Sequence, residues 1–296
     1  MNPRLGLFCA LLTLSVAGAA AASEPWRTAH LRGECDSALS EARAAAEKGE
    51  PEAMLQMSDW HFFGTCLTKD DAESARWALL AAEAGLPRAQ VVAGQIYASG
   101  LGVQTDPAAA RRWYEKAAGA GDAEGMLLLA KLIGAQADPL AQELALAWAR
   151  RAADANYPPA YVHLAGQYSG GGRQTDYAEA ARWLDKAIVA GYRDNSVWVA
   201  WSWACLNLGR YDEVLRAVQQ VPKDAPEFKA AQINHAHALL LNGQVGNARE
   251  VYAANMTLRG ADEFRRILRE DLAELRRSGR DHPGMARIEK LFLNKP

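Results

Sequence analysis

The sequence lacks an excess of charge of one sign. It has 33 basic and 35 acidic residues, for a formal net charge of −2. Neutralising the phosphates of a nucleic acid requires a basic surplus, so we expect no nucleic-acid partner. Hydrophobic residues make up 50% of the chain, which is too large a share for a disordered protein. The composition therefore indicates a folded protein that does not bind polyanions.

Long hydrophobic runs are missing after the first 22 residues. Before that point the sequence has the layout of a secretory signal peptide, with a positive start, an apolar stretch at 5–16 and small residues up to Ala22. We expect cleavage after Ala22, a periplasmic or secreted mature protein, and no membrane span after cleavage. The alternative is a retained N-terminal anchor, although the apolar stretch is short for a spanning helix.

Motifs that carry catalytic chemistry are also missing. Neither Ser-x-x-Lys nor Gly-x-Ser-x-Gly occurs, so there is no sequence signature of a serine nucleophile. The six histidines include no pair at i,i+4 spacing that would favour a metal site. The glycine-containing loops Gly100-Leu101-Gly102 and 170–172 lack the Lys-Ser/Thr of a phosphate-binding loop. We therefore predict no enzyme activity, no metal and no cofactor.

What the sequence does contain is a repeat of about 35 residues. Tryptophan recurs at steps of 36, 35 and 35 residues, at Trp77, Trp113, Trp148 and Trp183. Alanine pairs follow each of the first three at a fixed distance, so we expect these indoles in a helical core rather than on a carbohydrate-binding surface. Each copy reads as two helices, the first at 51–63, 87–99, 123–135 and 158–169, the second at 71–84, 107–120, 139–155 and 176–190. Asp70, Asp106, Asp138 and Asp176 stand where the second helices need an N-cap.

The second copy resembles the Sel1-like repeat family. It carries the family pattern at Ala89, Gly94, Tyr97, Gly100, Gly102, Val103, Asp106, Ala110, Trp113, Tyr114, Lys116, Ala117, Ala118 and Gly121. The fourth copy also follows the pattern, whereas the first and third depart from it. Farther on, Trp198, Trp201, Gly209, Tyr211 and Pro226 resemble the tetratricopeptide repeat. The resemblance implies an all-α fold, an α-α superhelix (solenoid) of antiparallel helix pairs.

This register predicts how the chain is organised. We expect a signal peptide at 1–22, an N-terminal capping segment at 23–50 with a half-repeat helix at 35–49, and four Sel1-like repeats at 51–193. Two tetratricopeptide-like repeats should follow at 194–256, and capping helices at 257–296. Terminal units of this kind cover the open ends of a repeat stack.

The register also selects a disulfide. Cys9 lies in the signal segment, which leaves Cys35, Cys66 and Cys205, an odd number that allows at most one internal bridge. Cys35 begins the capping helix and Cys66 follows the next helix, so antiparallel packing brings them together. We predict a Cys35–Cys66 disulfide and a buried, unreactive Cys205.

Partner-binding positions follow from the family resemblance. In tetratricopeptide proteins, groove residues occupy set positions on the first helix of each pair. These positions correspond here to Asp59, Gln95, Lys131, Trp203, Asn207 and His237. Trp203 is the expected anchor, because a large exposed aromatic side chain is typical of an interaction surface. The alternative is that several of these side chains only face water.

The leading hypothesis is an exported adaptor that binds a protein or peptide in the concave groove of the solenoid, because Sel1-like proteins generally act as scaffolds. The alternative is an envelope hydrolase, β-lactamase-like or peptidoglycan-related, or a regulator of such an enzyme. A serine, a histidine and a carboxylate within hydrogen-bond reach would favour the hydrolase.

Overall fold

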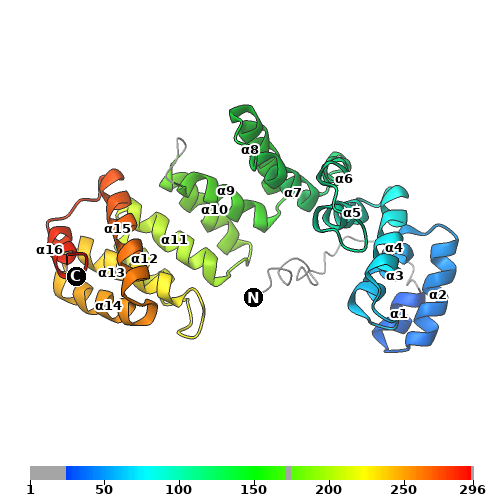
Figure 1. Cartoon of the computed structure of the whole chain (residues 1–296), viewed down its shortest axis with the longest axis horizontal. Coiled ribbons are helices and arrows are strands. Elements are labelled where there is room, and N and C mark those ends of the chain that lie inside the picture. The colour runs from blue at the N-terminus through cyan, green and yellow to red at the C-terminus, as the bar shows by residue number, and fades with distance from the viewer. Residues whose placement is uncertain (1–24, 171–174, 295–296) are drawn as a thin grey trace. The chain divides into compact units, whose positions relative to one another are not determined.

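The computed structural model describes residues 25–170 and 175–294, and every regular element in these residues is a helix (Figure 1). The chain divides into two compact units; the first ends at Asp106 and the second begins at Pro107. Helices that follow one another pack as antiparallel pairs within each unit. The predicted all-α fold, an α-α superhelix of antiparallel helix pairs, is confirmed. The predicted signal peptide and glycines 171–172 lie outside the described residues.

The helices have these bounds. The first unit holds α1 (Pro25–Leu31), α2 (Cys35–Glu47), α3 (Pro51–Phe63), α4 (Asp71–Glu83) and α5 (Pro87–Ser99). The second unit begins with α6 (Pro107–Gly119), α7 (Ala123–Gly134), α8 (Pro139–Asp154), α9 (Pro158–Ser169) and α10 (Tyr177–Val189). It continues with α11 (Asn195–Leu208), α12 (Tyr211–Val218), α13 (Phe228–Leu241), α14 (Val245–Arg259), α15 (Ala261–Arg277) and α16 (Gly284–Phe292).

The ends of the repeat helices have local causes. The Asp70 carboxylate accepts the backbone N–H groups of Ala72 and Glu73 at 2.9 and 3.0 Å, which satisfies donors that have no partner inside α4. Asp138 and Asp176 cap α8 and α10 in the same way. After the second helices, the chain turns through left-handed residues, among them Asn156 at φ 57°. The predicted N-caps at Asp70, Asp138 and Asp176 are confirmed.

Gly102 occupies a position that only glycine fits. Its φ is +65°, and a Cβ built there would lie 2.1 Å from the backbone oxygen of Asp71. The loop between α5 and α6 therefore approaches the start of α4 closely because it has no side chain at this point. This contact explains the second glycine of the repeat pattern.

Replacing Gly102 with alanine should lower the free energy of unfolding by about 2 kcal/mol or more, because the left-handed conformation is unfavourable and the loop must move away from Asp71. Urea unfolding followed by circular dichroism measures the loss. Gly246→Ala is the control, since Gly246 lies in α14 and a Cβ there meets nothing within 4 Å. Equal midpoints for the two variants would contradict the proposed role of the close approach.

The N-terminal end of the first unit differs in one respect from the expectation. The expected half-repeat helix is α2, but it is not alone, because α1 packs against it. Trp26 on α1 is buried with the alanines of α2 and with Trp60. A helix of seven residues is too short to show a period, which is why the sequence did not reveal α1.

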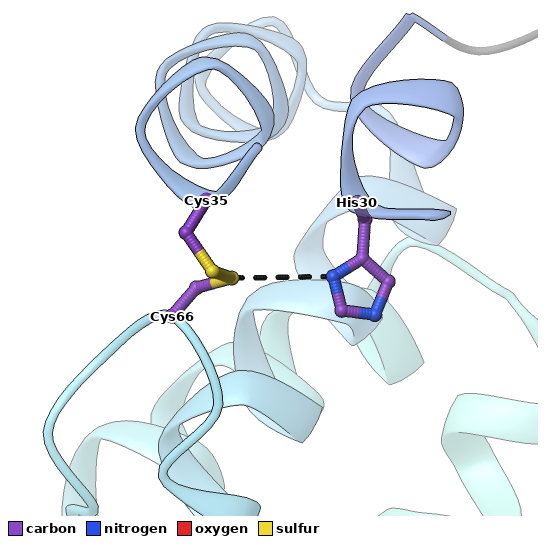
Figure 2. Close-up of a disulfide and its surroundings, with 3 residues drawn as sticks. All are labelled: His30, Cys35 and Cys66. Atoms are coloured by element: carbon purple, nitrogen blue, oxygen red, sulfur yellow. Dashed lines mark hydrogen bonds between the residues drawn. A yellow bond between two sulfur atoms is a disulfide. The ribbon is translucent and has the colours of Figure 1, made fainter. Parts of the chain in front are cut away.

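The predicted disulfide is confirmed. Cys35 and Cys66 are bonded, with their Cα atoms 5.1 Å apart, inside the usual range of about 4.4–6.8 Å. Figure 2 shows the bridge joining the start of α2 to the loop that follows α3, with the His30 ring of α1 beside it. The Nδ1 atom of His30 lies 4.0 Å from the Cys66 sulfur. Cys205 is free and buried, as predicted, and burial raises the pKa of its thiol.

Helix α15, the last but one, lies across other helices of the second unit. Its apolar stripe is buried, with Phe264, Leu268, Leu272 and Leu275 at 0% exposure. Its polar face reaches back to α10, because the Tyr177 hydroxyl donates to Glu274 Oε1 at 2.7 Å. Just beyond α15, the Ser278 hydroxyl donates to Asn207 Oδ1 at 2.7 Å. The helix therefore forms a wall beside α11 in addition to packing against α14.

The four repeat tryptophans lie at the rim of the core rather than inside it. The alanine pairs beside them are buried, but the indoles are half-buried. A cation covers each indole: Arg76 lies 4.4 Å from the Trp77 ring, Lys116 4.0 Å from Trp113, Arg151 4.7 Å from Trp148 and Lys186 4.2 Å from Trp183. The expectation of a core position thus holds for only part of each ring, because a lysine or arginine side chain lies over the outer part.

Candidate partner-binding groove

A groove in the second unit crosses the first helices of successive pairs. It has a volume of about 700 Å³ and is lined by residues of α9, α11, α13 and α15 and by Arg259 at the end of α14, with apolar atoms dominating its surface. We call it the C-terminal groove. Its apolar lining includes Val162, Ala165, Val199, Ala200, Ile233 and Ile267. Because residues at i, i+3, i+4 and i+7 share one helix face, Ser196, Val199, Ala200 and Trp203 of α11 all face this groove.

Trp203 lies in the C-terminal groove and is half-buried. Its ring packs against the buried core, with the His237 ring 6.3 Å away. The side chain is therefore fixed in orientation while part of its apolar surface stays open to a ligand. This is the geometry expected of an interaction anchor.

His237 belongs to a buried polar array below the groove. Its Nδ1 lies 2.6 Å from the Tyr252 hydroxyl, and its Nε2 lies 3.1 Å from Asp271 Oδ2. An ionised carboxylate only accepts, so Nε2 carries a proton and donates it to Asp271. Burial raises the pKa of Tyr252 well above its usual value, which keeps its hydroxyl protonated. His237 and Tyr252 are 0% exposed, so these two side chains stabilise the fold and do not contact a ligand.

Burial corrects the expectation for three of the six candidate residues. His237 is at 0% exposure, Asn207 at 3% and Gln95 at 7%, so none of them offers a side chain to a groove surface. Asn207 instead ties α11 to the segment after α15: its amide accepts from Ser278, and its backbone oxygen accepts from Arg280 Nε at 2.8 Å. Polar side chains at groove-like register positions were drawn into the core because hydrogen-bond partners were available there.

Lys131 lies in a second pocket, on the other side of α9. This pocket of about 730 Å³ is formed by α7, α8 and α9, and its surface is mainly polar. It also contains His163, whose pKa is lowered by burial and by the positive charge of Lys131. Gly166 of α9 lines both this pocket and the C-terminal groove, and a Cβ there would meet nothing within 4 Å. The two hollows therefore meet at Gly166.

Asp59 is the candidate in the first unit. It lies on α3 and is half-buried. Burial raises the pKa of its carboxyl, and the charge of Arg88 opposes that effect. A carboxylate in such a position can accept a hydrogen bond from a ligand.

Sequence reasoning missed three residues that shape the C-terminal groove. Glu227, at the start of α13, and Asp271, on α15, place carboxylates on its wall. Gly166 provides open space at its junction with the polar pocket. Of the three, only Gly166 left a signal in the sequence. A glycine inside a helical pattern weakens the helix, so its presence suggests a reason such as a need for space. Nothing in the repeat register points to Asp271, because α15 is not part of a repeat.

Within residues 25–170 and 175–294, no group of three or more histidine, cysteine or acidic side chains is placed to hold a metal ion. In the same part of the chain, no helix combines the length and the apolar character needed to cross a bilayer.

The fold and the groove define the class of protein as an α-helical repeat solenoid. Matching against family models finds the Sel1 repeat four times, at residues 51–86, 87–122, 123–157 and 158–192. The chain therefore contains four consecutive Sel1 repeats, and this solenoid fold is typical of protein–protein interaction scaffolds.

Solved structures agree with this assignment. A protective antigen present in uropathogenic Escherichia coli strains, which displays an SLR fold, is 25% identical with a TM-score of 0.61; the match covers 74% of this chain. The chain spans about half of that protein, since the match covers 48% of it. A Sel1 repeat protein from Oxalobacter formigenes is 20% identical with a TM-score of 0.61, covering 79% of this chain and 98% of that one. No curated protein matches the chain.

Proposed function

We propose that this protein is an exported scaffold that binds a segment of a partner protein in the C-terminal groove, with Trp203 as the anchor. The observation that carries the proposal is the groove itself: a largely apolar hollow between helices of the second unit, in which a half-exposed tryptophan is packed against the core on one side. Open apolar surface of this kind is costly to leave in water and is typical of sites that bind a partner. Lys131, next to the same groove across Gly166, is a secondary contact, and Asp59 is a separate contact in the first unit.

The Cys35–Cys66 bond supports the export part of the proposal. Disulfides form and persist in oxidising compartments such as the periplasm or the extracellular space, and are rare in the cytosol. Closing this bridge fixes the start of α2 against the loop after α3, so it is part of the folded first unit. The signal-peptide pattern at 1–22 points to the same compartments.

Filling the groove should abolish partner binding without unfolding the protein. Gly166→Leu places a large apolar side chain in open space on α9, and leucine favours a helix more than glycine does. We expect capture of cross-linked envelope proteins by the tagged variant to fall at least about tenfold. Gly246→Leu is the matched control, because Gly246 is an exposed helical glycine on α14, also with free space around it.

Trp203→Ala tests the anchor itself. The variant removes the apolar surface that a partner would cover, so capture should weaken by a similar factor while the helical circular dichroism stays unchanged. Unchanged capture by both Gly166→Leu and Trp203→Ala would exclude the C-terminal groove as the binding site. Loss of capture by Gly246→Leu as well would show that the effect does not depend on the groove.

A further inference from the structure

The charged side chains of the C-terminal groove differ in whether they are free to contact a ligand. Three ionisable residues line it: Glu227, Arg259 and Asp271. Arg259 is already engaged, since its Nη1 lies 2.9 Å from Glu263 Oε1 and its Nε donates to Asn255 Oδ1 at 2.9 Å. Its side chain is only 10% exposed. The cation is therefore not available to a ligand, whereas the two carboxylates face the groove.

Neither carboxylate is neutralised by a lysine or arginine among the described residues. Glu227 accepts a hydrogen bond from the Asn195 amide at 3.5 Å. Asp271 accepts from His237 Nε2, and its side chain remains 22% exposed. An apolar ligand that covered both carboxylates would remove their water and offer no hydrogen bond or charge in its place. Desolvating an ion in this way costs free energy. A ligand with a positive charge would compensate for this loss.

Asp271 is also held in a fixed orientation. Its Oδ2 is bound by a histidine that is itself bound to buried Tyr252, and both rings have 0% exposure. A carboxylate fixed in this way loses little conformational freedom when it binds a ligand, which favours binding. The array below the groove thus positions one carboxylate at its wall.

We propose that the partner segment recognised by the C-terminal groove carries a lysine or arginine beside apolar side chains. The apolar part covers Trp203 and the neighbouring aliphatic residues, and the cation lies between Glu227 and Asp271. This proposal rests on the proposed function, because it names the chemistry of the segment that the same groove binds. Asp271 and Glu227 then set specificity, and His237 acts as a positioning residue.

Peptide selection on the full mature protein tests this inference. A library of random peptides is selected on the wild-type protein, and the binders that Gly166→Leu fails to bind are kept as groove ligands. We expect lysine and arginine to be enriched among them. In one such peptide, changing the basic residue to glutamate should weaken binding to the wild-type protein at least about tenfold, measured by fluorescence anisotropy.

The same peptides then identify the protein residues that recognise the positive charge of the peptide. In the Glu227→Gln, Asp271→Asn double variant, the penalty for glutamate should fall to about threefold or less. Glu227→Gln alone should reduce the penalty in part, and it leaves the His237 array intact. Glu270→Gln is the matched control, since Glu270 neighbours Asp271 on α15 but is 61% exposed and paired with Arg266. This control should keep the full penalty.

The outcomes separate this inference from the proposed function. If groove ligands are found but show no basic enrichment and no charge penalty, the inference is wrong and the proposed function stands. If no selected peptide depends on Gly166, the proposed function fails as well. If the wild-type protein sediments as a dimer and Gly166→Leu as a monomer, a second copy of the chain fills the groove and the inference is wrong.

Discussion

His237→Ala is expected to lower the free energy of unfolding by about 3–5 kcal/mol. The ring is fully buried and joins α13 to α14 through Tyr252 and to α15 through Asp271. Its removal leaves a cavity and takes the partner away from a buried hydroxyl, which by itself costs about 1–3 kcal/mol. Urea unfolding followed by circular dichroism gives the value.

His235→Ala is the control for this prediction. His235 lies two residues away on the same helix, is only half-buried, and burial lowers its pKa. Its loss should change the unfolding free energy by less than about 1 kcal/mol. Tyr252→Phe keeps the ring but removes the hydroxyl, and should fall between the two. Equal losses for His237→Ala and His235→Ala would show that the buried array does not stabilise the fold.

Removing the disulfide is expected to cost about 3–4 kcal/mol, because the bridge closes a loop of 31 residues and restricts the unfolded chain. The measurement compares the urea midpoint of the first unit with and without reductant, and with Cys35→Ser, Cys66→Ser. The double variant is the control for the reductant itself, since its remaining cysteine among the described residues, Cys205, is free and buried. Reductant should therefore leave its midpoint in place. A wild-type midpoint that does not move on reduction would contradict the prediction.

The sequence predicted those features that depend on the repeat. Helices α3 to α10 fall where the period places them, because each helix start has an aspartate or proline and the second helices end at a left-handed glycine or asparagine. The Cys35–Cys66 bond followed from the same register, since antiparallel packing of neighbouring helices fixes which ends meet. These are local rules repeated along the chain.

The groove could be predicted only in part, for a physical reason. Trp203 was found because its register position is shared by repeat proteins, but its neighbours were not. Whether His237 faces water or the core depends on Tyr252, 15 residues away, and Asp271, 34 residues away, and no periodicity encodes those contacts. The carboxylate wall likewise depends on how α15 lies across the second unit. Such tertiary contacts decide between burial and exposure for polar side chains that a register treats alike.

A repeated helical hairpin also repeats any exposed apolar surface that it carries. Without cover, four half-exposed indoles would give the molecule four sites for non-specific binding. A lysine or arginine stacked on each ring, between 4.0 and 4.7 Å from its centre, keeps water and charge at these spots instead. Non-specific binding at the repeat tryptophans is thereby reduced, so a protein made of similar repeats can still bind selectively.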